Sequence, residues 1–477
     1  MRVIRGRPRP AANNHGIALR IILATYGYPP HYWGGSESYV RWLALYLLRS
    51  GHEPLVIAGA TDEQLDGMEP LYRDGHLRAA HYRQDDIPVI ACSNHPDTFE
   101  IYSRYDPAWA AAWEGVLSAW YGSDRSIQLL HLHAVSPLIN TSLIEASRRL
   151  FPGIRVLYSY HVPESCPKGT LLYFEKSFCT IRPSAAVCTA CLLQARSGWP
   201  VPIVRAIAAL LPERKVFPAG APVPFQLRRY LAAQIRTYGA FVNQVDRWLV
   251  FSRQVELLLR RLDVPADRIA MIRHGIDEVF LSKTEGGPTG DGRAESDRTT
   301  FVFIGRFKRV KGIATLLRAW MGSPPDAGRE LLLMGGAEAL DGELSDRLAE
   351  AARRPDIRQL GILPAEQVRE VLRSAHCVVI PSEWVEIGPL TLHEAIACGA
   401  NVITSDIGGC AELAEYYGDL CRTFRMGDAG DLWEKIRTFR YQPVTRTVAS
   451  QSWHNARVVE EYRGLLAYAS ADTIEPT

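Results

Sequence analysis

The chain has 477 residues, which exceeds one typical hydrophobic core, so we expect two domains. Hydrophobic residues make up 47% and charged residues 22% of the chain, and these globular values exclude a largely disordered protein. The 54 basic residues nearly balance the 52 acidic ones, and the sequence has neither a signal-peptide pattern nor a long apolar run. We therefore expect a cytoplasmic protein that does not bind nucleic acid.

Short apolar runs separated by loops begin close to the N-terminus. The run from Leu19 predicts a buried strand, and it leads through a loop with Gly34 and Gly35 into a predicted helix. The two glycines would let the backbone approach a ligand closely. Further strands are predicted at 53–59, 127–133, 155–161 and 246–252, with a loop-rich stretch between the first two. This order of elements is typical of a parallel α/β sheet.

Three histidines follow or end these predicted strands. His131 and His133 flank a leucine, and a lone histidine is more often a satisfied structural residue than a catalyst. His161 comes directly after the apolar run from Arg155, at the end of a strand where ligands often bind. We take His161 as the first catalytic candidate and His133 as the second.

Four cysteines gather in a loop-like region and end in a CxxC pair. A structural zinc site is one interpretation, because four thiolates can hold zinc in a tetrahedral arrangement. Free or packed thiols, and a disulfide or redox-active pair, are the alternatives. The candidate ligands are Cys166, Cys179, Cys188 and Cys191.

The segment from Trp199 to Pro218 mixes aromatic, aliphatic and basic residues. It is compatible with an amphipathic segment on a membrane surface, with helices that line an acceptor cleft, and with plain core. Beyond it, the polar, Gly-rich stretch from Lys283 to Thr299 predicts an interdomain linker.

The second half opens on a predicted strand, a Gly-bearing loop and a helix from Thr300 to Trp320. Gly305, Arg306 and Lys311 lie on that loop, at the edge of the sheet where ligands bind in open α/β folds. Arg306 and Lys311 would there neutralise a diphosphate, the first as a bidentate fork and the second as a point charge.

A second strand, turn and helix follow from His376 to Ala400, with Glu386 eight positions before Glu394. The turn around Gly388 would aim the N–H groups of Leu390 and Thr391 along the positive end of the helix dipole, where a phosphate is stabilised. Glu386 would then lie near the sugar of a donor, and Glu394 near its ribose hydroxyls. The pattern predicts a nucleotide-sugar site.

Eight short motifs follow one another along nearly the whole chain: YPPHYWGGSES at 28–38, HLH at 131–133, YHVPESCPKGTLL at 160–172, FSR at 251–253, RHGID at 273–277, GRFKRVKG at 305–312, PSEWVEIGPLTLHEA at 381–395 and SDIGGCAEL at 405–413. With these motifs in this order, the chain resembles the retaining glycosyltransferases of family 4. Two positions depart from that family's pattern, because His274 stands where the family usually has asparagine and Val162 stands where it usually has aspartate.

The resemblance implies the GT-B architecture, in which two Rossmann-like domains face each other across a deep cleft. An acceptor domain would span 17–282, a donor domain 299–444, and a last helix within 445–470 would cross back to complete the first domain. His161 would face the sugar and the acceptor, and Gly34 with Gly35 would close over the phosphates. Transfer would retain the anomeric configuration and need no cofactor or metal ion for catalysis.

The donor is expected to be a UDP-, GDP- or ADP-sugar, and the acceptor a glycan, a lipid-linked glycan or a small molecule such as a natural-product precursor. Peripheral contact with the inner membrane surface is compatible with this assignment. Two alternatives remain open from sequence: a nucleotide-sugar 2-epimerase of the same fold, and a catalytically silent binding subunit. Neither alternative would transfer a sugar to an acceptor. The 2-epimerase would convert the nucleotide sugar without an acceptor, and the binding subunit would be catalytically silent.

Overall fold

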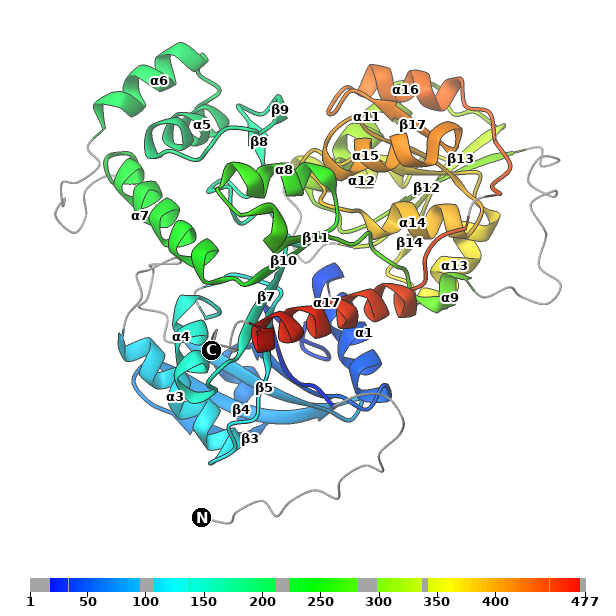
Figure 1. Ribbon diagram of the computed structural model, residues 1–477. Coiled ribbons are helices and arrows are strands. Elements are labelled where there is room, and N and C mark those ends of the chain that lie inside the picture. Colours follow the sequence, from blue (N-terminus) through cyan, green and yellow to red (C-terminus); the bar gives the residue numbers. More distant parts are fainter. Residues whose placement is uncertain are drawn as a thin grey trace.

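The computed structural model describes residues 18–32, 34–94, 107–136, 138–211, 223–281, 298–336, 342–445 and 447–471. Two separate α/β sheets organise these residues, a nine-stranded sheet in the N-terminal half and a six-stranded sheet in the C-terminal half (Figure 1). The linker predicted from Lys283 to Thr299 lies almost entirely outside the described residues, so the domain limits stay predictions.

The N-terminal sheet has the order β11-β10-β7-β6-β1-β2-β5-β4-β3. Its central strands are buried on both faces: the consecutive residues Ile21, Ile22 and Leu23 have no exposed surface. Burial on both faces explains the continuous apolar sequence of these strands. The predicted strands are confirmed. The strands of this sheet are β1 (Arg20–Thr25), β2 (Glu53–Gly59), β3 (Glu69–Arg73), β4 (Leu77–Gln84), β5 (Ile87–Asn94), β6 (Leu129–Leu132), β7 (Arg155–Ser159), β10 (Arg247–Val250) and β11 (Ile269–Met271).

The stretch expected to be loop-rich is instead largely ordered structure. β5 pairs in parallel with β2, and β4 and β3 extend the sheet in antiparallel order. The prediction was wrong because β4 carries polar residues such as His81 and Arg83 among its apolar ones, which hides a strand that is buried on one face only. The apolar start of β5 did carry the signal used for the other strands.

Helices cover the N-terminal sheet, and three of them form a separate projection. We call α5, α6 and α7 the helical lobe; in Figure 1 it extends away from the sheet, with α5 packed against both α6 and α7. A two-stranded hairpin of β8 (Leu172–Tyr173) and β9 (Ser177–Phe178) leads into it. The helices of this half are α1 (Gly35–Arg49), α2 (Asp62–Asp66), α3 (Pro107–Tyr121), α4 (Thr141–Leu150), α5 (Ala185–Ser197), α6 (Val201–Leu210), α7 (Val223–Gln244), α8 (Arg253–Arg261), η1 (Ala266–Arg268) and α9 (Glu278–Leu281).

The C-terminal sheet is parallel throughout, with the order β14-β13-β12-β15-β16-β17. Its strands are β12 (Thr299–Ile304), β13 (Arg329–Met334), β14 (Ile357–Gly361), β15 (Cys377–Ile380), β16 (Asn401–Ser405) and β17 (Cys421–Phe424). Its helical elements are η2 (Arg309–Lys311), α11 (Ile313–Met321), α12 (Gly342–Ala351), α13 (Ala365–Ser374), α14 (Leu390–Ala397), α15 (Gly408–Tyr417), η3 (Gly418–Leu420) and α16 (Ala429–Arg437).

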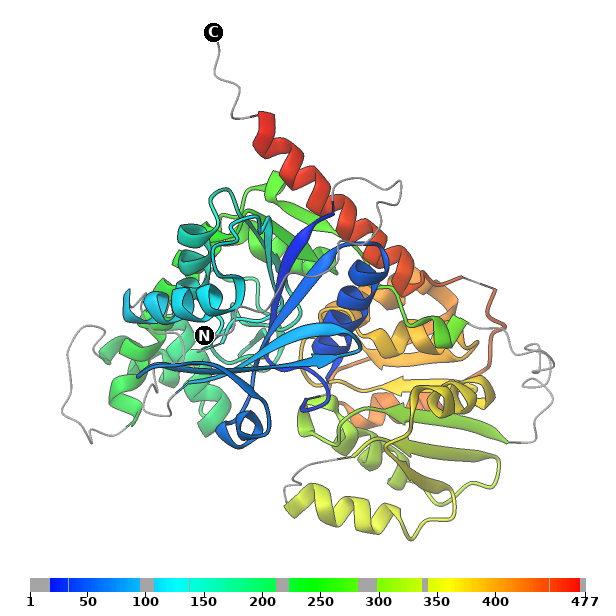
Figure 2. The same ribbon diagram turned by 90° about the horizontal axis from the view of Figure 1, so that it is seen from below.

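The last helix, α17 (Gln451–Ala471), returns to the N-terminal half, as predicted (Figure 2). The Asn455 side-chain amide donates to the Trp42 carbonyl of α1 at 3.2 Å. Farther along, the Tyr462 hydroxyl lies 2.6 Å from Nδ1 of His131 on β6. No helix among the described residues is long and apolar enough to cross a membrane.

Both sheets reverse their strand order beside a central strand, and such reversal points are where open α/β sheets bind ligands. In the N-terminal sheet this point lies between β1 and β6, and in the C-terminal sheet between β12 and β15. The loops that follow these four strands therefore form the edges on which the predicted site residues lie.

Candidate active site

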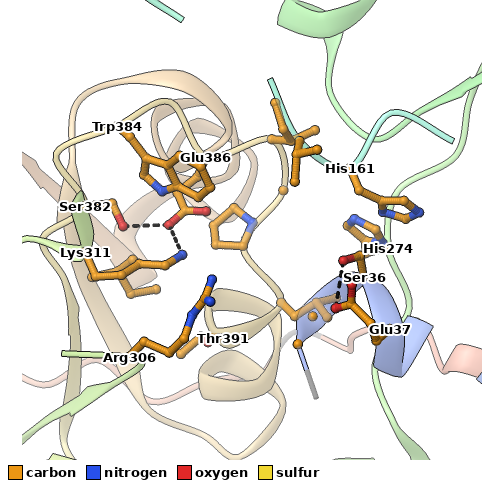
Figure 3. A pocket seen from close by; sticks show the side chains of 18 of the residues that line it. Ser36, Glu37, His161, His274, Arg306, Lys311, Ser382, Trp384, Glu386 and Thr391 are labelled. Atoms are coloured by element: carbon orange, nitrogen blue, oxygen red, sulfur yellow. Dashed lines mark hydrogen bonds and ion pairs between the residues drawn. The ribbon is translucent and has the colours of Figure 1, made fainter. Parts of the chain in front are cut away.

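A cavity of about 510 Å³ lies between the two reversal points and is lined by both halves of the chain (Figure 3). This volume falls in the usual range for sites that enclose a small molecule. Ten of the residues predicted for the site line it: Gly34, Gly35, His133, His161, Arg306, Lys311, Glu386, Gly388, Leu390 and Thr391.

Lys311 and Glu386 form an ion pair in the wall of the cavity. Lys311 Nζ lies 2.7 Å from Glu386 Oε1, and Ser382 donates to the same oxygen at 2.7 Å. Burial by itself raises the pKa of the Glu386 carboxyl, but the Lys311 ammonium and the hydrogen bonds from Lys311, Trp384 and Ser382 outweigh it and leave the pKa lowered. The Trp384 ring lies 4.9 Å from Lys311 Nζ and adds a cation–π contact. The ammonium group is thereby held in one place.

Two glycines allow the loops around this ion pair to approach each other. Gly312 follows Lys311 with a φ of +71°, and a Cβ atom there would lie 1.6 Å from the Pro381 carbonyl oxygen. At Gly409, at the start of α15, a Cβ atom would lie 2.6 Å from the Ile387 carbonyl oxygen. Only glycine fits at these two positions, which ties the GRFKRVKG and SDIGG motifs to the geometry of the site.

Arg306 reaches toward the N-terminal half. Burial raises the pKa of Tyr32 and the pKa of Glu37, and the positive charge of the Arg306 guanidinium group offsets part of each shift. Ser36 donates to Glu37 Oε2 at 2.9 Å, and a Cβ atom at Gly34 would lie 2.4 Å from that oxygen. The loop before α1 and the loop after β12 therefore interact across the cavity.

Helix α14 begins at Leu390, as the sequence predicts, with Pro389 as its N-cap. The N-terminus of this helix lines the cavity through Leu390 and Thr391. Its N–H groups and its dipole add positive potential beside Arg306 and Lys311. The C-terminal side of the cavity thus collects the groups that stabilise negative charge.

Gly305 and Glu394 are not among the residues that line this cavity. The Gly305 N–H group donates to the Met334 carbonyl at 3.0 Å, so this glycine shapes the loop after β12. Glu394 lies one turn into α14, where burial and repulsion from Asp277 raise its pKa to about 7. Their roles in donor binding stay predictions.

The N-terminal side of the cavity is built from aromatic rings. His161 Nε2 lies 3.1 Å from His133 Nδ1, so the second histidine orients the first. Phe251 stacks on His161 at 5.0 Å between ring centroids and on His274 at 3.8 Å. Burial lowers the pKa of His161 to about 3, and the pKa values of His133 and His274 also lie well below the usual range. These rings are neutral at pH 7.

Two more histidines connect this cluster to α17. His454 Nδ1 donates to the Arg273 carbonyl at 2.8 Å, so its Nε2 accepts the hydrogen bond from the Tyr39 hydroxyl, also 2.8 Å away. His131 lies between Ser159 and Tyr462, at 2.8 Å and 2.6 Å. His131 is therefore a satisfied core residue, which was the ordinary alternative at this position. Burial lowers the pKa of His454 to about 4.

Charge is divided between the two sides of the cavity. Among the described lining residues, the two cations, Arg306 and Lys311, both come from the C-terminal half. The N-terminal half contributes two carboxyl groups, Glu37 and Glu164, and burial raises the pKa of both. Glu164 Oε1 accepts from the Val135 N–H group at 2.8 Å. One side is suited to an anion and the other to an uncharged ligand group.

Several lining residues were not predicted as site residues, namely Tyr32, Ser36, Glu37, Glu164, His274, Ser382 and Trp384. All seven lie within the sequence motifs quoted above, which was the available signal. Glu164 lies in YHVPESCPKGTLL, and Trp384 in PSEWVEIGPLTLHEA. Their side-chain orientation depends on partners from other loops, and spacing alone does not give it.

The four clustered cysteines are free thiols outside the cavity. Within the described part of the chain, no group of three or more histidine, cysteine or acidic side chains is arranged to hold a metal ion. Burial raises the pKa of Cys188 to about 12, and the other three thiols add to this shift, so the four do lie near one another. The Phe174 N–H group donates to Cys191 Sγ at 3.3 Å.

Comparison with known sequences places the chain in a family. A model described as Glycosyltransferase Family 4 matches residues 33–280, and one described as Glycosyl transferases group 1 matches residues 291–439. Over 157 residues the chain is 32% identical to alpha-maltose-1-phosphate synthase of Mycolicibacterium smegmatis, and this alignment covers 31% of the chain and 40% of the synthase. The chain therefore spans well under two thirds of that relative's length.

Solved structures show the same architecture. Sucrose-phosphate synthase from Thermosynechococcus elongatus superposes with a TM-score of 0.60 at 18% identity, covering 94% of this chain and 100% of that one. An Anabaena protein in complex with UDP and glucose superposes with a TM-score of 0.54 at 15% identity, covering 95% and 99%. Likeness at these identities shows the fold alone, and it confirms the predicted GT-B architecture. Because the model described as Glycosyltransferase Family 4 matches more than half of the chain, the protein belongs to glycosyltransferase family 4.

Proposed function

We propose that this protein transfers a sugar from a nucleotide-sugar donor to an acceptor hydroxyl, with retention at the anomeric carbon and without a metal ion. One observation carries the proposal: Arg306, Lys311 and the start of α14 converge on one side of a cavity of about 510 Å³. These groups would supply the positive charge that a departing diphosphate needs as negative charge develops on it.

The ion pair with Glu386 adds to this assignment. Glu386, itself fixed by a hydrogen bond from Ser382, holds the Lys311 ammonium group, so little reorganisation would be needed when a diphosphate arrives. Glu386 would remain next to the transferred sugar and support it electrostatically. Gly34 and Gly35 would lie against the phosphates from the opposite side of the cavity.

In the proposed step, the acceptor oxygen forms a bond to the anomeric carbon on the face from which the diphosphate leaves. The bond between that carbon and the diphosphate oxygen breaks, and its electron pair stays with the phosphate. A phosphate oxygen takes the proton of the acceptor hydroxyl, so charge and atoms balance without a covalent enzyme intermediate.

The N-terminal side of the cavity would hold hydroxyl groups of the sugar and the acceptor. His133 Nε2, His274 Nδ1 and Glu164 Oε2 are buried and have no hydrogen-bond partner among the described residues. Buried polar atoms without partners cost free energy, so a ligand with several hydroxyl groups would be favoured there. His161 would contact these hydroxyls as a neutral ring, because its pKa of about 3 prevents protonation at pH 7.

Calorimetry with UDP, GDP and ADP tests the donor assignment, and we expect one of them to bind clearly more tightly than the others. Glu394→Gln is expected to weaken binding of the preferred nucleotide by about tenfold while leaving kcat nearly unchanged. The reason is that a ribose contact is made equally in the ground and transition states. The matched control is Glu366→Gln, an exposed glutamate at the start of α13. No binding of any of the three nucleotides would contradict the proposed function, whereas equal binding by Glu394→Gln would contradict only the ribose role.

We also propose that Cys166, Cys179, Cys188 and Cys191 bind a structural zinc ion. The thiols lie near one another but are not arranged to hold a metal ion, so they would have to move together on binding. The site would tie the β8–β9 hairpin to α5. Elemental analysis of protein purified without added metal should find about one zinc per chain, and serine at Cys188 and Cys191 should abolish it and lower Tm. Metal-free protein with the same Tm as zinc-supplemented protein would refute the site.

A further inference from the structure

Helix α6 exposes apolar side chains on its outer face. Trp199, just before the helix, is 52% exposed, Ile203 is 49% exposed and Leu210 is 85% exposed. Ile203, the exposed Ala206 and Leu210 are separated by three and four residues, so these three lie on one face of the helix, and Trp199 lies before its N-terminal end. The opposite face is apolar too, because Val204 and Ala208 are buried against the lobe. A surface helix of this composition leaves an apolar stripe in contact with water.

The lobe also carries a one-sided charge. Among α5, α6 and α7, the first two helices have one arginine each and the third has three, and none of the three contains an aspartate or a glutamate. The whole chain is nearly balanced, with 54 basic and 52 acidic residues, so this excess is local. Arg196 on α5 and Arg236 on α7 are exposed.

Two of the other arginines, Arg205 and Arg228, make contacts that hold the lobe together. Arg228 donates to the carbonyls of Ala208, Ala209 and Leu211 and so caps the C-terminal end of α6. Arg205 donates to the Tyr173 hydroxyl at 2.6 Å. These contacts fix helix α6 in the lobe, and its exposed apolar face points outward.

We propose that the α6 face of the helical lobe binds an anionic lipid membrane surface. An apolar stripe with a tryptophan at one end, on a lobe whose exposed charges are arginines, matches helices that lie in the membrane interface, where aromatic and aliphatic side chains enter the acyl boundary. The arginines would interact with anionic headgroups, and the absence of acidic residues from these described helices removes the repulsion that such headgroups would otherwise meet.

A second copy of the chain is the main competing occupant. Two lobes facing each other would bring exposed arginines of both copies together with no carboxylate from these helices to pair with them. Like-charge contacts of this kind oppose association, whereas an anionic surface is attracted. The charge pattern therefore favours lipid over a homodimer.

Cosedimentation with lipid vesicles tests the proposal on the full-length chain. We expect binding to vesicles of phosphatidylcholine with phosphatidylglycerol, and little binding to phosphatidylcholine alone. Ile203→Glu/Leu210→Glu should weaken vesicle binding by on the order of tenfold or more, because it places two carboxylates in the apolar face. Arg196→Gln/Arg236→Gln should weaken it by about fivefold for each arginine removed.

Matched variants elsewhere on the surface serve as controls. Ile362→Glu changes an isoleucine that is 84% exposed in the C-terminal half, and Arg353→Gln changes an exposed arginine of that half. Neither should alter vesicle binding. Calorimetric binding of the preferred nucleoside diphosphate should be unchanged in every variant, which shows that each is folded. If the double glutamate variant does not fold, Leu210→Glu alone is used, because Leu210 is too exposed to support the core.

Equal binding to both kinds of vesicle, or unchanged binding by the α6 and arginine variants, would overturn the proposal. So would the finding that Ile203→Glu converts a dimer to a monomer in size-exclusion chromatography without any vesicle binding in the wild type, because α6 would then be an interface between copies. Nucleotide binding is measured separately, so failure of the membrane proposal leaves the proposed transferase function untouched.

Discussion

Lys311→Ala is expected to lower kcat by about a hundredfold or more with a saturating donor. The ammonium group would act on charge that develops on the leaving diphosphate, and one such preorganised donor typically contributes about 3–4 kcal/mol to the transition state. Release of the nucleoside diphosphate is the quantity to measure. Lys308→Ala is the matched control, because Lys308 lies on the same loop, is exposed and does not line the cavity.

Lys311→Ala also removes the partner of a buried carboxylate, and an unpaired buried charge costs about 3–5 kcal/mol of stability. A second variant separates the two effects. Lys311→Met/Glu386→Gln leaves no buried charge, so it should recover stability while remaining inactive. Recovery of turnover in this double variant, or full activity of well-folded Lys311→Ala, would remove Lys311 from the proposed catalytic step.

Acid is expected to destabilise the protein strongly between about pH 7 and about pH 5, through the buried histidines. The pKa of His161 is lowered to about 3 and that of His454 to about 4, and those of His131, His133 and His274 lie well below the usual range. In the unfolded chain each would titrate near 6.5. Below that pH the unfolded state binds protons that the folded state does not, so stability falls as the pH falls, by about 2 kcal/mol for each histidine over this interval.

Three carboxyl groups act in the opposite direction. Burial raises the pKa of Glu37, Glu164 and Glu394, so the folded state binds protons there before the unfolded state does, and stability rises as the pH falls toward their unfolded values. Five histidines outnumber three carboxyls, so a net loss of stability is expected as the pH falls. Urea unfolding at several pH values measures it.

His131→Gln should reduce the slope of stability against pH by about 1.4 kcal/mol per pH unit below pH 6, whatever its effect on stability at neutral pH. His31→Gln, the same substitution at an exposed histidine, is the matched control. A slope unaffected by the His131 substitution would mean that this ring is protonated in the folded state.

The amino-acid sequence by itself determined the class of fold and the edge on which the site lies. Runs such as that of β1 are apolar because both faces of a parallel sheet are buried, and this pattern is readable without the structure. Arg306, Lys311 and Glu386 could be expected near one another because their loops follow β12 and β15, and ligands bind at the carboxyl edge of such sheets. The start of α14 at Leu390 followed from local turn and helix signals.

The tertiary structure alone decided which side chains meet. The histidine cluster draws its members from β6, from the loops after β6, β7 and β11, and from α17, and no local spacing records that His454 reaches Tyr39. The outward direction of the apolar face of α6 was equally unreadable, because a helix that is apolar on both faces looks like core in sequence. The physical reason is that periodicity reports the burial of an element, whereas hydrogen-bond partners and pKa shifts depend on contacts between segments far apart in the chain.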